Sequence, residues 1–468
     1  MEERFSKQQR MYRPKLHRAR EDTTSKLPDS LLSQILSHLP TKDTVRTSVL
    51  SHRWKSVYLL VPSLDMSSSE FPGYSAFVSF IEKILAFSRE GNSVLYKLKI
   101  SIQKDENAQS CVTRWIDFVA TPKLNHLDVE CTLANRKFLE AIPQILYIEC
   151  DTLVYLRLHR VSMGEYKSVS LPCLKSMRLE HNVYASDASL EIFISSCPVL
   201  EDLTIVRMVP DNVKVLRVRS QSLTSCHVDR LFGEGDDYVN GLVREGSGVL
   251  IDAPRLKYLK FEDDLTDSKI ITNPVSLEKV NIVFVFGEHD FTDVDLPKRN
   301  MVRSFFNSIS GVKEMKISAY TMEFLDYNRE YETYDPLPQF CNVSTLNVGF
   351  YVSNLDMMMP TLLESFPNLK SLVLKLDYYH PSREEEAADV RLASIPPCLL
   401  SSLESVTIKR FNRGPVNMEL FRYFLEKSQV LKKLVLDFRC SVVEEGFNML
   451  RDLLALPRRS SSCQVLLC

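Results

Sequence analysis

The chain lacks the segments that would place it in a membrane or send it out of the cell. No apolar run in its 468 residues approaches the roughly 20 residues that a membrane-spanning helix needs. Residues 1–20 are polar and basic, without the apolar core of a secretory signal. The 58 Lys and Arg residues nearly balance the 60 Asp and Glu residues, so neither nucleic acid nor a membrane surface is favoured as a partner. We expect an intracellular protein, in the cytoplasm, the nucleus or both.

Paired cysteines are also missing. The 11 Cys residues stand singly, with no CxxC spacing, which argues against a secreted disulfide framework. Several occupy apolar positions, such as Cys131 and Cys197, where a reduced thiol acts as a small hydrophobic side chain. Cys226-His227 is the nearest approach to a zinc-ligand pair, and no second pair accompanies it. The sequence therefore predicts no metal and no cofactor.

Motifs of catalysis are absent as well. The chain has no GxSxG and no HExxH, and its His residues lie singly. Gly233–Asp236 superficially resembles a nucleotide-binding loop, but no GxGxxG or P-loop follows and acidic residues surround it. Residues 219–251 hold five of the 13 Gly residues, and this irregular region is predicted to be a flexible surface loop. An enzyme stays open as an alternative, but the expectation is a non-catalytic protein.

What the chain does have is repetition. A pattern of apolar-x-x-apolar-x-apolar returns thirteen times, and its last two apolar positions alternate like a strand that buries one face. Helix-like stretches such as 188–195 and 357–366 lie between copies. One strand and one helix cannot enclose their own apolar face, but stacked units can. The pattern predicts an α/β fold in which a curved solenoid carries a parallel sheet on its concave face; an ordinary α/β domain is the alternative. The copies are Leu95/Leu98/Ile100, Leu124/Leu127/Val129, Leu153/Leu156/Leu158, Leu174/Met177/Leu179, Leu200/Leu203/Ile205, Val213/Leu216/Val218, Leu256/Leu259/Phe261, Leu277/Val280/Ile282, Val312/Met315/Ile317, Val343/Leu346/Val348, Leu369/Leu372/Leu374, Leu403/Val406/Ile408 and Leu431/Leu434/Leu436.

A different pattern fills residues 26–66, where three short helices are predicted. The first carries an apolar stripe from Leu32 to Leu39 and ends at Pro40. Thr41 and Ser51 are predicted to cap the second and third helices. A chain of about 40 residues rarely buries enough surface to fold unaided. The segment should therefore pack against a larger neighbour or keep part of its apolar surface for a partner.

This segment resembles an F-box, in the plant subgroup whose motif runs LPxxLLxxILSxLPTKxxVRTSVLSxRW. The matching residues include Leu27-Pro28, the run 39–42, the run 45–51 and Arg53-Trp54, whereas Tyr58 replaces a second Trp. The resemblance implies docking onto the Skp-type adaptor of a cullin–RING ubiquitin ligase. The adaptor-binding residues that it implies are Leu27, Pro28, Leu31, Leu32, Ile35, Leu39, Pro40, Val45, Val49 and Trp54.

The rest of the chain resembles the same group of proteins. The copies are similar to the irregular leucine-rich repeats of plant F-box proteins, although the usual Asn after the strand is mostly missing. From Ile395 the chain resembles an FBD region, with a predicted helix at Met418–Lys427, a strand at Leu431–Leu436 and a final strand at Gln464–Leu467. The predicted divisions are a basic disordered arm (1–22), the F-box (23–68), the leucine-rich-repeat solenoid (69–394) and an FBD-type cap (395–468).

Together these resemblances imply a substrate-recognition subunit of an SCF-type E3 ubiquitin ligase, whose repeats capture a target protein. A leucine-rich scaffold outside any ligase is the alternative. The residue between the last two apolar positions of each copy should face away from the core. In the first two thirds these residues form a basic stripe, which suggests a target with acidic or phosphorylated residues; a solvated row without a ligand is the alternative. The target-binding residues of this hypothesis are Lys99, Arg157, Arg178, Arg217, Lys260 and Lys316.

Overall fold

The structure is a computed structural model. The predicted arm at 1–22 and the glycine-rich stretch Gly233–Asp236 lie outside the residues that it describes. The described residues are 27–87, 95–103, 111–121, 123–132, 139–166, 168–208, 210–231, 244–263, 266–283, 303–326, 337–352, 355–377, 392, 394–410, 415–437, 451–453 and 455–467.

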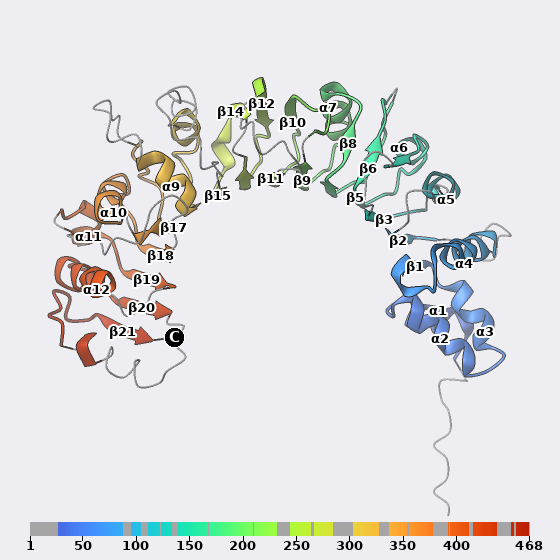
Figure 1. Cartoon of the computed structure of the whole chain (residues 1–468), viewed down its shortest axis with the longest axis horizontal. Coiled ribbons are helices and arrows are strands. Elements are labelled where there is room, and N and C mark those ends of the chain that lie inside the picture. Colours follow the sequence, from blue (N-terminus) through green and yellow to red (C-terminus); the bar gives the residue numbers. More distant parts are fainter. Residues whose placement is uncertain are drawn as a thin grey trace, which may run out of the picture.

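The chain forms an arch with its strands along the inner side and most of its helices outside (Figure 1). Fifteen strands make one sheet in which every neighbouring pair is parallel. The curved α/β solenoid predicted from the repeats is thereby confirmed. In spatial order the strands are β1 (Ser63–Ser67), β2 (Lys97–Gln103), β3 (His126–Thr132), β5 (Tyr155–His159), β7 (Ser176–Glu180), β9 (Asp202–Met208), β11 (Ser225–Leu231), β13 (Tyr258–Glu262), β15 (Lys279–Val283), β16 (Glu314–Ile317), β17 (Thr345–Tyr351), β18 (Ser371–Asp377), β19 (Ser405–Lys409), β20 (Lys433–Asp437) and β21 (Gln464–Leu467).

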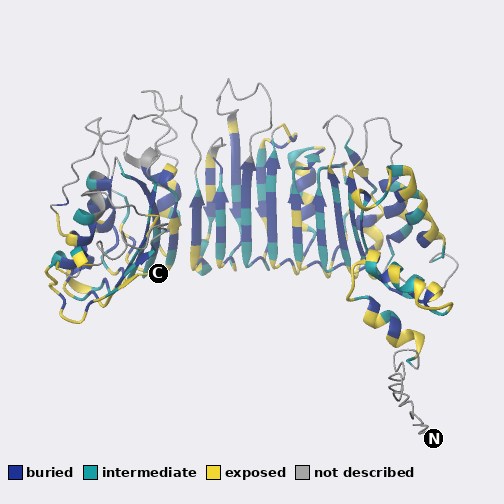
Figure 2. Cartoon of the chain, turned by 60° about the horizontal axis from the view of Figure 1, so that its bottom comes forward, coloured by how far each residue is buried: buried dark blue, intermediate teal, exposed yellow. Residues whose placement is uncertain are grey.

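The repeated apolar positions explain this arrangement. On β18, for example, Leu372, Leu374 and Leu376 are fully buried while the residues between them are partly exposed. Figure 2 shows the same alternation of burial along neighbouring strands. Parallel strands need long crossover connections, and here those connections run over the convex side. Each repeat therefore buries its apolar face beneath its own connection and against the next repeat.

Helices supply most of these connections. The amphipathic helix predicted at Met418–Lys427 is α12, and its residues Leu420, Phe421, Phe424 and Leu425 are buried as expected. The longer connecting helices are α4 (Tyr74–Phe87), α5 (Val112–Val119), α7 (Asp187–Ser195), α9 (Ala319–Asp326), α10 (Leu355–Glu364) and α12 (Pro415–Lys427). The shorter ones are α6 (Leu146–Glu149), α11 (Pro397–Ser401) and the 3₁₀ turns η4 (Ser68–Glu70) and η8 (Pro274–Ser276).

Two small parallel sheets also lie in the connections. One contains β4 (Glu140–Ile142), β6 (Val161–Met163) and β8 (Val183–Tyr184), and the other contains β10 (Val215–Arg219), β12 (Arg244–Asp252) and β14 (Thr266–Thr272). The copy Val213/Leu216/Val218 belongs to β10, so its assignment to the concave sheet was wrong. Its apolar side chains are buried as the pattern requires, but the strand lies in the second layer.

The prediction of a flexible loop across 219–251 was also wrong for the parts that the structure describes. β11 joins the main sheet between β9 and β13, and β12 joins the small sheet. The apolar set of β11 is Leu223, Cys226 and Val228, all of them buried. Cys226 takes the place of a larger aliphatic residue, so the repeat was not counted. β1 was missed too, because its set Val61, Leu64 and Met66 follows directly on the F-box.

The F-box segment forms a small helical unit at one end of the arch. It contains α1 (Asp29–Leu36), α2 (Thr41–Arg46), α3 (Trp54–Val57) and the 3₁₀ turns η2 (Thr47–Val49) and η3 (Tyr58–Leu60). Leu32, Leu36, Trp54, Val57 and Val61 make a core separate from that of the solenoid.

The predicted caps of the second and third helices are not found. Pro40 precedes α2 and Arg53 precedes α3, and neither helix start has a side-chain cap. The Thr41 hydroxyl instead accepts a hydrogen bond from the backbone N–H of Asp65 on β1, at 2.8 Å. This bond joins the helical unit to the first strand of the sheet.

One repeat retains the asparagine that leucine-rich repeats use after the strand. Asn182 is fully buried; its amide donates to the Leu158 carbonyl at 2.9 Å and accepts from the Val161 N–H at 3.0 Å. Both backbone groups belong to the preceding repeat, so Asn182 ties two repeats together.

We predict that Asn182→Ala lowers the free energy of unfolding by about 1–3 kcal/mol, because two buried backbone groups lose their partner. Asn125→Ala is the matched control, since Asn125 is exposed and makes no side-chain hydrogen bond in the described part of the chain. Urea unfolding of both variants measures the difference. Equal unfolding midpoints would contradict the role given to Asn182.

Candidate functional site: two interaction surfaces

The first candidate surface is a set of apolar side chains on the F-box helices that face solvent. Leu31, Ile35 and Leu39 are 45%, 49% and 44% exposed, and Val49 is 85% exposed. Leu31 and Ile35 follow the i, i+4 spacing of one helix face. Pro28 and Pro40 are also exposed, and Leu27 and Val45 are partly buried. The predicted adaptor-binding residues thus include an apolar surface that nothing in the described chain covers.

Two of the predicted adaptor-binding residues lie elsewhere. Leu32 is fully buried and Trp54 is 7% exposed, so both belong to the core of the helical unit. The stripe that predicted α1 therefore has two faces, of which Leu32 and Leu36 point inward. These residues support the surface and do not form it.

An ion pair fixes the ends of this surface. The Arg53 Nε donates to the Asp29 carboxylate at 2.7 Å, and its Nη2 donates to the Leu27 carbonyl. Arg53 precedes α3 and Asp29 begins α1, so the guanidinium links the two helices. The backbone of Leu27-Pro28 is thereby held beside the rest of the unit.

The second candidate surface is the concave face of the sheet. The strand registers align one central row across it, beginning at Asp65, Lys99, Asp128, Arg157 and Arg178 and ending at Val435 and Leu466. Two positions further along the strands a second row carries acidic residues. These are Glu130, Glu180, Asp229, Glu262 and, near the C-terminal end of the sheet, Asp437.

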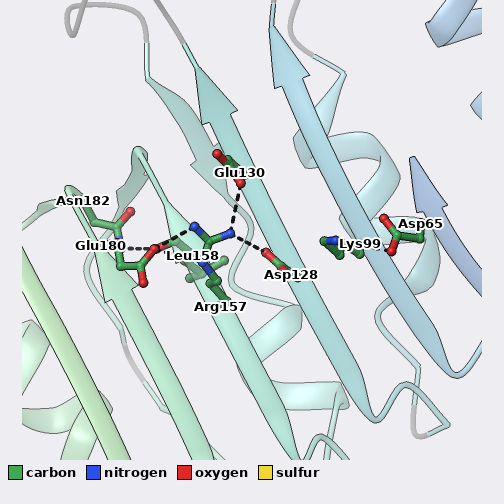
Figure 3. A network of polar contacts seen from close by, with 8 residues as sticks. All are labelled: Asp65, Lys99, Asp128, Glu130, Arg157, Leu158, Glu180 and Asn182. Carbon is green, nitrogen blue, oxygen red and sulfur yellow. Dashed lines mark hydrogen bonds and ion pairs between the residues drawn. The ribbon is translucent and has the colours of Figure 1, made fainter. Parts of the chain in front are cut away.

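Arg157 lies where the two rows meet. Its guanidinium contacts Asp128 at 3.1 Å, Glu130 at 3.1 Å and Glu180 at 2.8 Å, from β3 and β7 on either side (Figure 3). Its side chain is only 19% exposed. Burial raises the pKa of Asp128, and Arg157 acts against that rise. Arg157 is therefore enclosed by carboxylates of its own chain.

Other cations of the central row are paired as well. Lys99 contacts Asp65 at 3.3 Å. Lys260 lies 3.4 Å from Glu262, and its Nζ is within hydrogen-bond distance of the His227 Nε2, at 2.9 Å. The basic stripe predicted from the sequence thus alternates with carboxylates that neutralise much of it. The sequence signal for the acidic row is the residue two positions after the central residue of each repeat.

Arg217 does not lie on the concave face, so its place in the predicted stripe was wrong. It belongs to β10 in the second layer, with Glu191 of α7 at 3.9 Å. Arg178 and Lys316 do lie on the concave central row, and both are exposed. In the described part of the chain neither has an ion-pair partner.

Two histidines on the concave face are held neutral. Burial and the nearby Lys97 lower the pKa of His126 to about 4, and burial lowers that of His159 to about 4 as well. His126 also stacks on Tyr155, with ring centres 4.3 Å apart and planes 7° from parallel. These residues were not predicted to belong to a binding surface.

Comparison with known proteins covers both surfaces. The F-box domain family model matches residues 24–57. A second family model, which describes the LRR repeats of FBD-associated F-box protein At5g56370, matches residues 112–288. The FBD family model matches residues 391–436. FBD-associated F-box protein At5g22730 of Arabidopsis thaliana is 60% identical over 96% of this chain and 95% of its own length. The chain belongs to the plant F-box proteins with leucine-rich repeats and an FBD region. Within this F-box/FBD/LRR family, F-box/FBD/LRR-repeat protein At5g22700 of the same plant is 42% identical over 95% of this chain and 98% of its own length.

The family assigns the two surfaces to different modules. The exposed apolar residues lie in the F-box match, and Arg157 and Arg178 lie in the repeat match. None of the matching family models describes an enzyme family. In the described residues, no helix is long and apolar enough to cross a membrane.

We predict that Arg157→Ala lowers the free energy of unfolding at pH 7 by about 1–3 kcal/mol, because three neighbouring carboxylates lose their shared cation. The loss should be smaller at pH 4, where protonation relieves their repulsion. Urea unfolding at both pH values tests this. Arg178→Ala is the matched control on the adjacent strand and should change stability by less than about 0.5 kcal/mol. An equal loss in both variants would contradict the role given to Arg157.

We also predict that His126 and His159 make the fold sensitive to mild acid. Their folded pKa values of about 4 lie below the unfolded value of 6.5. The unfolded chain therefore binds more protons between these values, and stability falls as the pH drops through this window. The double variant His126→Gln, His159→Gln should lose less stability between pH 7 and pH 5 than the natural chain does. An identical pH dependence in urea unfolding would argue against these two groups.

Proposed function

We propose that this chain is a substrate-recognition subunit of an SCF-type E3 ubiquitin ligase. Its F-box docks on a Skp-type adaptor, and its solenoid holds a target protein for ubiquitination. The observation that carries the proposal is the exposed apolar set Leu31, Ile35, Leu39 and Val49, displayed on a helical unit with its own core. Membership of the F-box/FBD/LRR family supports the same function.

The energetics of the exposed set favour a partner protein. Burying a Leu or Ile side chain contributes roughly 1.5–3 kcal/mol before the entropy of association is subtracted. A few such anchors close together are enough for a specific interface. Leu32 and Trp54 act indirectly in this proposal, because they hold α1 and α3 in the arrangement that presents the anchors.

The chain itself acts without catalysis in this proposal. The ligase components carried by the adaptor transfer ubiquitin to a Lys of the bound target. The solenoid raises the effective concentration of that Lys near the transfer machinery and orients it. No metal or cofactor is needed for this role.

The proposed target contacts are the central-row cations Lys99, Arg157, Arg178, Lys260 and Lys316, with an acidic or phosphorylated target. Arg178 and Lys316 support it best, because they are exposed and keep their charge available to a ligand. Arg157 is held by three carboxylates and would have to exchange them for a ligand.

The test is binding of a purified Skp-type adaptor to the full chain. Leu31→Asp with Ile35→Asp should reduce adaptor affinity at least a hundredfold, since two desolvated anchors become charged. Ile192→Asp is the matched control: Ile192 is 43% exposed on α7 of the solenoid, far along the chain from the F-box. Its adaptor affinity should stay within about twofold, as expected of a surface substitution away from the interface.

The same measurement separates the ligase subunit from a leucine-rich scaffold outside any ligase. A scaffold would show no adaptor binding even in the natural chain. Retained binding in the Leu31→Asp, Ile35→Asp variant would mean that a different surface holds the adaptor. Either result would overturn the assignment of this apolar set.

A further inference from the structure

The N-terminal half of the concave face carries two cations that have no carboxylate partner in the described residues. Lys97 begins β2, and Arg178 lies at the centre of β7. No ion pair forms at either side chain in the described part of the chain. Between them, His126 of β3 and Tyr155 of β5 stand side by side as a stacked pair.

The registers place these four residues on one face. Lys97 is paired with His126 and His126 with Tyr155, so the three form a continuous row across β2, β3 and β5. Tyr155 is paired with Ser176, which puts Arg178 diagonally across from Tyr155. Diagonal neighbours in a sheet are within reach of long side chains.

The chemistry of this group is that of an anion site. Arg178 offers a fork of N–H donors that matches a carboxylate or a phosphate. Tyr155 makes no side-chain hydrogen bond in the described chain, and burial raises the pKa of its hydroxyl, so this O–H stays a donor. His126 is neutral and adds no competing charge.

The neighbouring row sets a boundary to the site. Glu130 and Glu180 lie further along β3 and β7, where they are bound to Arg157. These carboxylates repel an anion that approaches the row of Glu130 and Glu180, two residues beyond the central row. An acidic ligand is therefore confined to the row of Lys97 and to the central row at Arg178. The nearby carboxylates on these rows have partners of their own: Asp128 contacts Arg157, and Asp202 of β9 accepts a hydrogen bond from the Ser176 hydroxyl at 3.3 Å.

We infer that Lys97, Tyr155 and Arg178 bind an extended acidic segment of the target protein, which crosses the strands with one acidic group at Lys97 and another at Arg178. This inference rests on the proposed function, and it specifies which acidic groups the target segment should carry. Charge complementarity at two fixed points selects the occupant, and the stacked His126–Tyr155 pair lies under the segment between them.

The spacing of the two cations sets the spacing of the acidic groups. Lys97 and Arg178 are three strands apart, about 14 Å at ~4.8 Å per strand, and two residues apart along the strands, about 7 Å, which together give about 16 Å. An extended chain covers about 3.3 Å per residue. Acidic residues about four or five positions apart therefore fit the site best, and residues one or two positions apart can reach only one cation.

The experiment measures binding of fluorescent nine-residue peptide pools to the purified full chain by polarisation. Each pool has two Glu residues one to six positions apart, with the other positions randomised among neutral residues. Pools with Glu four or five apart should bind at least tenfold tighter than pools with Gln in their place. Pools with phosphoserine in place of Glu separate a phosphate ligand from a carboxylate ligand, and both belong to the same site.

Three variants locate the binding. Arg178→Gln should weaken the best acidic pool at least tenfold, and Lys97→Gln should weaken it and remove the preference for spacing. Arg217→Gln is the matched control, because Arg217 lies on β10 in the second layer. Its affinity should stay within twofold of the natural chain. Unchanged thermal unfolding in all three variants confirms that the fold is intact.

Three outcomes would overturn the inference: equal binding of Glu and Gln pools, tighter binding of a Lys pool, or unchanged binding in Arg178→Gln. A preference for Lys would mean that the acidic row of Glu130 and Glu180 governs the face. Adaptor binding is measured on the F-box, at a different surface. Loss of the acidic preference with intact adaptor binding would therefore refute this site alone, and the reverse result would refute the ligase assignment alone.

Discussion

The parallel register of the main sheet is the constraint on which the rest of the structure depends. Each strand buries one face and exposes the other. The backbone N–H and C=O groups on both edges of an inner strand find hydrogen-bond partners only when the strand has a neighbour on each side. Fifteen strands in one continuous register turn this local rule into a long concave surface. The same register aligns every outward-facing side chain into rows, so the chemistry of the surface is set row by row.

The rows also determine which charged side chains on that surface form ion pairs. Like charges within the basic row, or within the acidic row, would repel one another if the two rows made no contact. Arg157, Lys99 and Lys260 instead pair with carboxylates on their own or adjacent strands. A cation without an ion-pair partner in the described residues, such as Arg178, keeps its charge available for another molecule. Under the proposed function, recognition on this face would be concentrated at a few such positions.

The F-box, at one end of the arch, is stabilised by its own small core and not by the register of the sheet. Its core of Leu32, Leu36, Trp54, Val57 and Val61 is small, and the solenoid core does not include it. So small a unit has too little interior for all its apolar side chains, and some remain outside. Its tie to the sheet includes the Thr41 hydroxyl bond to the Asp65 backbone. The two candidate interaction surfaces therefore occupy separate parts of one chain, as the proposed function requires.

The sequence alone determined the repeated strand, the helical entry and the order of the modules. Local periodicity decides which face of a strand or helix is apolar, so twelve of the thirteen predicted copies lie in the main sheet. The tertiary structure alone decided which layer a strand joins, as Val213/Leu216/Val218 on β10 shows, because one apolar pattern serves both layers. It also decided which cations are neutralised. Pairing depends on residues of adjacent strands, more than 20 positions away along the chain for Arg157 and its three carboxylates, and no local pattern records that neighbour.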